Sequence, residues 1–321
     1  MIITEDIKKI SRETKRKLVW EMFYNCNGNC SYCFQRERRN NKIPIDVNKL
    51  KETSLKIKEF IIKNKIDRIS LAGGEISILK NEDLKQIINS FVDIDNLEIC
   101  IITNFSRSVE YYSDLIKGFT KKINFLLSYH VKDMKGFFDK VENFIKCSPN
   151  ADVSINYVME SRLETKKFFY FFNKLKKKYE ALDLHLIIKM QPLYNKEKSN
   201  FYGFDQNKEK IFKLLNDKNI NKYIGFKNKL EIEYTDFRKQ NLRERELLKY
   251  GKEYLIKGTT GFECSIVEFM IEPDGGVYPA CYDKMIFNIL KEDIPLFKNG
   301  IFINKCNTDR CLCDFLCIEK K

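Results

Sequence analysis

The sequence predicts an α/β fold in which a parallel sheet closes, fully or partly, into a barrel. Six strand-like apolar segments alternate with helix-like segments over residues 18–190. The connections between the strands are long enough to hold a helix each, and strands joined in this way run parallel. In a barrel of parallel strands, the catalytic and binding residues lie at the carboxyl ends of the strands.

Each element is predicted from its own pattern of apolar residues. The six strands are expected at residues 18–23, 68–71, 96–102, 122–128, 152–158 and 182–189. The helices between and after them are expected at residues 50–63, 82–92, 108–117, 134–146 and 162–179. In the first helix Leu50, Ile57 and Ile61 form one apolar stripe, and Pro44 and Asp46 precede it as helix-start residues.

Composition limits the class of protein. The chain has 321 residues and 11 cysteines, and it contains no apolar stretch near 18 residues and no signal peptide. These features predict a cytoplasmic protein without a membrane partner, in which clustered thiols serve metal binding or catalysis rather than disulfides. The net charge of +13 comes mostly from lysines spread along the chain, so it does not predict a nucleic-acid partner.

A loop with three cysteines follows the first predicted strand. Cys26, Cys30 and Cys33 lie within eight residues, and Asn27 and Gly28 between them are residues that form turns. Such a backbone can aim all three sulfurs at one point. A four-iron cluster usually takes four cysteines, so a cluster held by three keeps one iron open to an outside ligand. A structural zinc or disulfide knot is the alternative.

The spacing C-x3-C-x2-C, with Tyr32 before the last cysteine, closely resembles the signature of the radical S-adenosylmethionine (radical SAM) enzymes. The resemblance covers roughly residues 15–190 and implies a partial (β/α)6 barrel. It implies a [4Fe-4S] cluster on Cys26, Cys30 and Cys33 whose open iron binds S-adenosylmethionine (SAM). It also implies an electron donor such as flavodoxin or ferredoxin, reductive cleavage of SAM to a 5′-deoxyadenosyl radical, and abstraction of a substrate hydrogen.

The second predicted strand ends in Ala72-Gly73-Gly74-Glu75. Two adjacent glycines after a strand let a ligand approach the backbone closely. The sequence resembles the Gly-Gly-Glu motif of the radical SAM enzymes, which implies that Gly73, Gly74 and Glu75 hold the amino group of SAM. A plain turn with a solvated glutamate is the alternative.

Polar residues also end the third and fourth predicted strands. Thr103 and Asn104 end the third strand and Ser128 ends the fourth, so all three are expected at the rim of the barrel as candidate cofactor-binding residues. The family resemblance implies that Ser128 contacts the ribose hydroxyls and the methionine carboxylate of SAM. It assigns no residue to the adenine, because the glycine-rich adenine motif is not visible in the fifth strand.

Six further cysteines crowd the last 58 residues, where there is little room for an independent core. Cys264 and Cys281 flank Asp274-Gly275, a strong hairpin signal between apolar segments, and the hairpin is expected to bring both thiols to one end. The remaining four are Cys306, Cys311, Cys313 and Cys317. A bound metal is therefore expected to help this segment fold.

The stretch C-x11-G-x4-C from Cys264 to Cys281 resembles the opening of the SPASM and twitch extensions of radical SAM enzymes. The resemblance implies one auxiliary [4Fe-4S] cluster in a small β-hairpin and helix extension. Its expected ligands are Cys264, Cys281, Cys311 and Cys313, with Cys306 or Cys317 as substitutes. A zinc ion at this second site is the alternative.

The predicted organisation has four parts. A lead-in segment or short helix covers residues 1–17, the radical SAM barrel residues 18–190, a bridging segment residues 191–258, and the cysteine-rich domain residues 259–321. The predicted reaction is the oxidation or cross-linking of a peptide or small molecule. The competing hypothesis is a non-catalytic zinc or iron–sulfur module that binds nucleic acid through its positive surface.

Overall fold

The structure, a computed structural model, contains two compact units. The α/β unit comprises residues 20–55 and 69–225, and the β-rich unit comprises residues 1–19, 56–68 and 226–321, so the boundaries fall inside three elements. The structure describes residues 7–11, 15–30, 33, 35, 38, 43–129, 136–158, 185–189, 193–195, 200–202, 229–234, 236, 239–243, 256–257, 263–279, 284–305, 310–311 and 318–319.

The sheet that dominates the α/β unit follows the order of the chain. Its strands are β2 (Lys17–Glu21), β3 (Arg68–Ala72), β4 (Glu98–Thr103), β5 (Ile123–Tyr129), β6 (Ala151–Val158) and β7 (His185–Lys189), hydrogen-bonded in that order. The pairs β4–β5, β5–β6 and β6–β7 are parallel. The prediction of an α/β fold with a parallel sheet is therefore confirmed.

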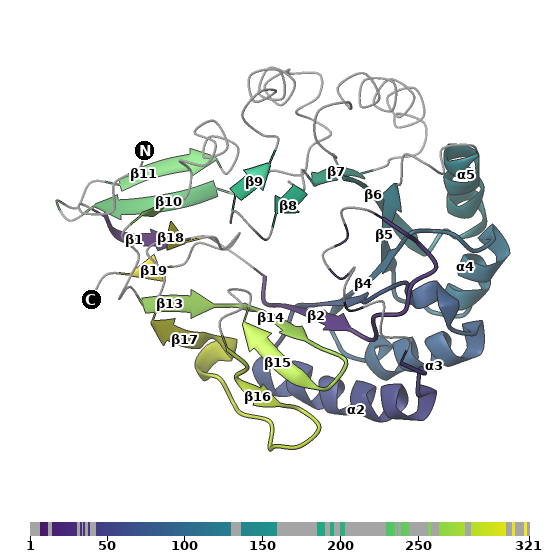
Figure 1. Cartoon of the computed structure of the whole chain (residues 1–321), viewed down its shortest axis with the longest axis horizontal. Coiled ribbons are helices and arrows are strands. Elements are labelled where there is room, and N and C mark those ends of the chain that lie inside the picture. The colour runs from purple at the N-terminus through teal and green to yellow at the C-terminus, as the bar shows by residue number, and fades with distance from the viewer. Residues whose placement is uncertain are drawn as a thin grey trace. The chain divides into compact units, whose positions relative to one another are not determined.

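Helices connect these strands as predicted. They are α2 (Val47–Asn64), α3 (Asn81–Val92), α4 (Val109–Ile116) and α5 (Phe137–Cys147), with a short 3-10 helix η2 (Ile76–Ile78) after β3. Helices α3, α4 and α5 lie along one side of β4, β5 and β6 (Figure 1). They do so because each carries an apolar stripe: Leu84, Ile87 and Phe91 of α3 are all buried. The helix predicted at 162–179 lies outside the described residues.

Aromatic side chains fill the core between β4, β5, α4 and α5. The rings of Phe105 and Tyr112 stack at 4.6 Å between centroids, and Phe125 and Phe144 meet edge to face at 4.9 Å. Phe105 has a φ of 56°, an uncommon value for a bulky residue. This core supports the loop that follows β4.

A six-stranded sheet forms most of the β-rich unit. In spatial order its strands are β11 (Lys239–Arg243), β10 (Lys229–Tyr234), β1 (Ile7–Ser11), β19 (Ile318–Glu319), β13 (Glu263–Ile266) and β17 (Phe302–Lys305). Residues 7–11 were expected in a lead-in segment or short helix, but they form a strand because β10 and β19 supply backbone partners on both sides.

The hairpin predicted at Asp274-Gly275 is confirmed. It joins β14 (Glu268–Ile271) to β15 (Gly276–Pro279), which pairs with β16 (Phe287–Asn288). Gly275 has a φ of 88° and donates its N–H to the Glu272 carbonyl at 2.9 Å. Cys264 lies in β13, which pairs with β17 and β19. Cys281 lies outside the described residues, so the expectation that the hairpin brings both thiols to one end stays a prediction.

Short elements complete the described structure. They are β8 (Leu193–Asn195), β9 (Asn200–Tyr202), β12 (Ile256–Lys257), β18 (Arg310–Cys311) and the 3-10 helix η5 (Lys298–Gly300). Strand β8 pairs with β9, and β12 pairs with β18. Within the described part of the chain, no helix has the length and apolar character needed to cross a membrane.

Candidate active site

The cysteine loop follows β2 and holds its thiols partly exposed. Cys26, Cys30 and Cys33 form no disulfide and have intermediate exposure. The Gly28 N–H donates to the Cys26 sulfur at 3.2 Å, and the Cys33 N–H donates to the Cys30 carbonyl at 3.3 Å. A Cβ placed on Gly28 would lie 3.5 Å from the Cys26 sulfur and 3.8 Å from the Cys30 sulfur, so both sulfurs flank this glycine.

The donor set of this loop fits an iron–sulfur cluster, and a zinc ion, which also takes thiolates, stays the alternative. Among the described residues, no three His, Cys, Asp or Glu side chains converge on a single-ion site. A four-iron cluster spreads its thiolates over separate irons, and thiolate is the ligand that it takes. Cys26, Cys30 and Cys33 thus suit a cluster by the chemistry and partial exposure of their sulfurs.

The Gly73-Gly74 turn after β3 lies directly against the segment that precedes the cysteines. A Cβ on Gly74 would lie 1.9 Å from the Asn25 carbonyl oxygen, and one on Gly73 would lie 2.5 Å from the Phe23 oxygen. The Gly74 N–H donates to Phe23 O at 2.6 Å, and the Glu75 N–H donates to Asn25 O at 2.9 Å. The glycines therefore let the chain's own backbone approach, and their predicted contact with SAM stays a prediction.

The Glu75 carboxylate is buried, with only 2% of the residue exposed, so the alternative of a solvated glutamate is wrong. Its Oε1 accepts from the Ser77 N–H at 3.0 Å and the Thr103 hydroxyl at 2.6 Å, and its Oε2 accepts from the Asn104 N–H at 2.6 Å. Charge-assisted bonds of this kind are the strong ones in proteins. Glu75 therefore joins the end of β3 to the end of β4.

Thr103 and Asn104 are engaged with protein groups. Thr103 is buried, and its hydroxyl also lies 3.2 Å from the hydroxyl of Tyr112. Burial, followed by the nearby Glu75 carboxylate, raises the pKa of Tyr112 to about 12, so this phenol stays neutral near pH 7. The Asn104 side chain donates to the Asn27 side-chain oxygen at 2.8 Å and so reaches the cysteine loop.

Sequence reasoning treated Asn27 only as a turn former and missed this contact with Asn104. The two asparagines stand 77 positions apart, and nothing in the local sequence pairs them. The order of the strands in the sheet brings their loops together, because β2, β3 and β4 are neighbours. Their contact is therefore information that the tertiary structure adds.

Ser128 lies near the carboxyl end of β5, half-buried, and is paired in register with Asn156 of β6. Asn156 is 8% exposed, and its side-chain oxygen has no hydrogen-bond partner among the described residues. Sequence reasoning missed Asn156, although an asparagine within an apolar strand was a signal that could have drawn attention to it. The role of Ser128 toward SAM stays a prediction.

The second cysteine group is described only in part. Cys264 is buried in β13, where it is paired in register with Asn304 and Ile318. The backbone of Cys311 pairs with Ile256 in the two-stranded sheet of β12 and β18. Cys281, Cys306, Cys313 and Cys317 lie outside the described residues. Their ligand roles stay predictions.

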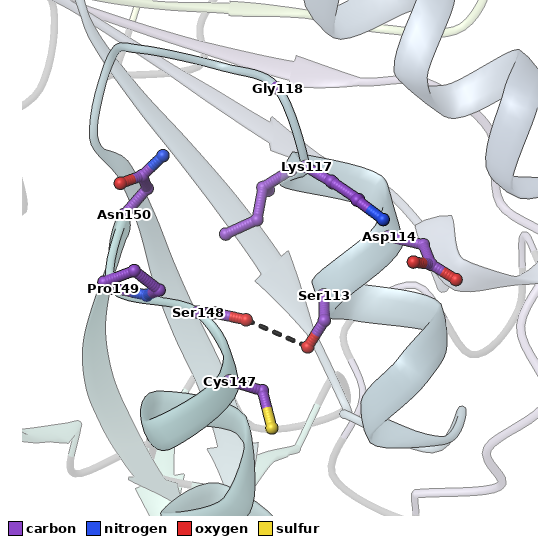
Figure 2. Close-up of a pocket in the computed structure, with 9 residues that line it drawn as sticks. Ser113, Asp114, Lys117, Gly118, Cys147, Ser148, Pro149 and Asn150 are labelled. Atoms are coloured by element: carbon purple, nitrogen blue, oxygen red, sulfur yellow. Dashed lines mark hydrogen bonds between the residues drawn. The ribbon is translucent and has the colours of Figure 1, made fainter.

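A cavity of about 360 Å³ opens elsewhere in the α/β unit, between the C-terminal ends of α4 and α5. The Ser113 and Ser148 hydroxyls lie 2.9 Å apart beside it (Figure 2), and Cys147 and Asn150 also line it. Asn150 directly precedes β6, so the cavity lies at the amino ends of the strands. The cysteine loop follows the carboxyl end of β2, and the cavity is therefore no part of the candidate site.

Residues 20–128 match the family model described as "Radical SAM superfamily". The chain carries a radical SAM domain. The match includes the cysteine loop, the Gly73-Gly74-Glu75 turn and the strands from β3 to β5, which the structure places in one sheet. Proteins of this superfamily use a [4Fe-4S] cluster and SAM, in agreement with the donor set of Cys26, Cys30 and Cys33.

Two curated proteins are similar to the chain that contains this radical SAM domain. A cysteine-type anaerobic sulfatase-maturating enzyme of Clostridium novyi (strain NT) is 24% identical over 277 residues, covering 79% of this chain and 70% of that protein. The GTPase Obg of Brachyspira hyodysenteriae (strain ATCC 49526 / WA1) is 36% identical over 96 residues, covering 28% of this chain and 14% of that protein. The chain thus spans about one seventh of the GTPase and over two thirds of the maturating enzyme.

Solved structures share the fold. Native anSMEcpe with bound AdoMet superposes with a TM-score of 0.51 at 18% identity, covering 88% of this chain and 79% of that chain. Its complex with AdoMet and the Kp18Cys peptide superposes with a TM-score of 0.50 at 19% identity over the same shares. At this identity the likeness establishes the fold alone, and it agrees with the partial barrel expected around the radical SAM domain.

Proposed function

We propose that the chain is a radical SAM enzyme whose cluster is held by Cys26, Cys30 and Cys33. When bound, the cluster and SAM supply reductive cleavage of SAM to methionine and a 5′-deoxyadenosyl radical, which takes a hydrogen atom from the substrate. The observation that carries the proposal is the junction of the three-thiol loop with the Gly73-Gly74 turn, formed by two backbone hydrogen bonds. Three cysteines leave one iron for SAM.

The chain's own residues would orient SAM beside that iron. A carboxylate offers about four acceptor positions, and the Glu75 carboxylate uses three of them on protein donors. One position remains for the amino group of SAM, together with the backbone of Gly73 and Gly74. Ser128, half-buried at the rim, is proposed for the ribose hydroxyls and the carboxylate of SAM.

We propose a peptide as the substrate class. The curated relative that matches most of this chain is described as a sulfatase-maturating enzyme, and a structure of the same fold is described with a bound peptide. Both descriptions favour a peptide over a free small molecule as the first substrate to test. The proposed reaction is an oxidation or a cross-link of a side chain of that peptide.

An auxiliary cluster is proposed for the second cysteine group, with Cys264 and Cys281 as ligands and two of the four tail cysteines completing the set. Bound there, it would supply an acceptor for the electron left on the substrate after hydrogen loss. The register of β13 places Cys264 opposite Ile318, the residue that follows Cys317 in sequence. This pairing favours testing Cys317 alongside Cys311 and Cys313.

The decisive experiment measures 5′-deoxyadenosine. Anaerobically reconstituted protein with dithionite and SAM should form it, Cys30→Ala should not, and Cys147→Ala should behave as wild type because Cys147 is an exposed thiol away from the loop. No 5′-deoxyadenosine from wild-type protein with intact clusters would overturn the proposal. Zinc without iron or sulfide in anaerobically purified protein would instead support the non-catalytic metal module.

Cys281→Ala tests the second site separately. Under the proposal it loses the auxiliary cluster, keeps at least part of the 5′-deoxyadenosine formation, and yields no oxidised peptide. Normal iron content and full product yield in this variant would remove Cys281 from the ligand set.

A further inference from the structure

Three polar residues close a hydrogen-bonded ring between the cysteine loop and the loop after β4. The Asn104 side-chain nitrogen donates to Asn27 Oδ1 at 2.8 Å, and the Asn27 side-chain nitrogen donates to Ser106 Oγ at 2.8 Å. The Ser106 backbone N–H then donates to Asn104 Oδ1 at 3.0 Å. Asn27 stands between Cys26 and Gly28, so the ring holds the start of the cysteine loop.

The direction of each bond in the ring is fixed by the backbone. The Ser106 N–H can only donate, so the Asn104 side chain must turn its oxygen toward Ser106 and its nitrogen toward Asn27. Asn27 must then present its oxygen to Asn104, which leaves its nitrogen for the Ser106 hydroxyl. Each of the three residues therefore donates one hydrogen bond of the ring and accepts one.

The loop after β4, which supplies Asn104 and Ser106 to the ring, is held by hydrogen bonds and by a buried side chain. The Asn104 N–H is held by the buried Glu75 carboxylate at 2.6 Å, and the Phe105 N–H by the Thr103 hydroxyl at 3.0 Å. Lys140 of α5 donates to the Phe105 carbonyl, and its ammonium nitrogen lies 4.5 Å from the centroid of the Phe105 ring. Because the Phe105 side chain is buried, it anchors the loop that carries Asn104 and Ser106 to the hydrophobic core.

The other side of the ring lies beside a hydrogen bond to a cysteine sulfur. The Gly28 N–H donates to Cys26 Sγ at 3.2 Å, and Asn104 Nδ2 lies 3.8 Å from where a Gly28 Cβ would be. An N–H that donates to a thiolate stabilises negative charge on it. Reduction adds negative charge to an iron–sulfur cluster, so hydrogen bonds to its sulfurs raise its reduction potential.

We propose that Asn27, Asn104 and Ser106 are positioning residues for the iron–sulfur cluster: their ring holds the Gly28 N–H on the Cys26 sulfur and thereby sets the retention and the reduction potential of the cluster. The inference rests on the proposed function, since it assumes a cluster on Cys26, Cys30 and Cys33. It gives Asn104 a role through the cysteine loop instead of a direct contact with SAM.

The test compares variants of the ring in the reconstituted full-length protein. Asn27→Ala and Asn104→Ala each remove two of the three bonds, whereas Ser106→Ala removes only the bond to its hydroxyl. The matched control is Asn150→Ala, which removes one side-chain bond, to Phe119 O at 2.6 Å, at the amino end of β6. Urea unfolding followed by Trp20 fluorescence checks that every variant is folded.

Two readouts follow the cluster that responds to SAM. The first is the rate at which its electron paramagnetic resonance signal decays when an iron chelator removes iron from the cluster. The second is its midpoint potential, measured by reductive titration of the same signal. We expect Asn27→Ala and Asn104→Ala to lose the signal about fivefold faster, the factor for about 1 kcal/mol of net hydrogen bonding. We also expect both to shift the potential to more negative values, with a smaller effect for Ser106→Ala.

The double variant Asn27→Ala/Ser106→Ala tests the ring as a unit. It should match Asn27→Ala alone, because Asn27→Ala already removes the bond to the Ser106 hydroxyl. Additive effects, or ring variants that equal Asn150→Ala in both readouts, would overturn the inference while leaving the proposed function intact. If Cys26→Ala has the same iron content and the same signal as wild type, the proposed function itself fails, and this inference fails with it.

Discussion

Replacing Gly74 by alanine should disrupt the junction beneath the cysteine loop. The added Cβ would lie 1.9 Å from the Asn25 carbonyl oxygen and 2.6 Å from the Tyr24 oxygen. Real Cβ atoms essentially never come closer than 3.0 Å to such atoms, so the backbone before Cys26 must move by about 1 Å. The movement strains the hydrogen bonds from Gly74 to Phe23 and from Glu75 to Asn25.

The expected cost can be built from these contacts. Overpacking costs about 1–3 kcal/mol, and two weakened hydrogen bonds cost about 0.5–1.5 kcal/mol each. The free energy of unfolding should therefore fall by about 2–6 kcal/mol. The assay is urea unfolding followed by fluorescence, because Trp20 is the single tryptophan, is 1% exposed and packs 6.5 Å from Phe91 in the α/β unit.

Gly118→Ala is the matched control. Gly118 also lies in the α/β unit, but a Cβ there would meet nothing within 4 Å. Its φ of 90° leaves only the conformational penalty of about 1–2 kcal/mol. Gly74→Ala should therefore unfold at a lower urea concentration than Gly118→Ala. Equal midpoints for the two variants would refute the reasoning that the chain's own backbone requires glycine at position 74.

Three other outcomes are expected. Glu75→Gln should lower the free energy of unfolding by about 1–3 kcal/mol, because the amide NH2 group replaces a carboxylate oxygen and cannot accept the hydrogen bonds that this oxygen accepts. An unchanged urea midpoint would contradict this. Arg16 lowers the pKa of Asp67 below its ordinary 3.8, so that pair stabilises the fold above this pH and loses its effect as the pH falls. Between pH 5 and pH 3 wild type should lose more stability than Asp67→Asn, by under about 1 kcal/mol since the Asp67 side chain is 37% exposed; parallel pH profiles from thermal unfolding would contradict the pairing. Iodoacetamide should label exposed Cys147 but not buried Cys100 in the native protein, as read by peptide mass spectrometry; equal labelling would contradict the burial of β4.

The sequence alone predicted the chemistry of the first site and determined the order of the elements around it. Clustered thiols at a C-x3-C-x2-C spacing are local information, and so is the alternation of strands with helices that predicts a parallel sheet. The Asp274-Gly275 hairpin was predicted for the same reason, because the turn needs a positive φ that glycine accepts and the structure gives Gly275 a φ of 88°.

Tertiary structure decided what each polar group at the rim touches. Glu75 was predicted as a contact for SAM, yet its burial and its three donors come from the ends of β3 and β4 meeting, which no local pattern specifies. The same holds for the ring that joins Asn27 to Asn104 and Ser106. The strand at residues 7–11 was missed because its partners, β10 and β19, lie more than 200 residues later in the chain. Spacing along the sequence fixes which atoms can bind, whereas the register of distant strands fixes which of them meet.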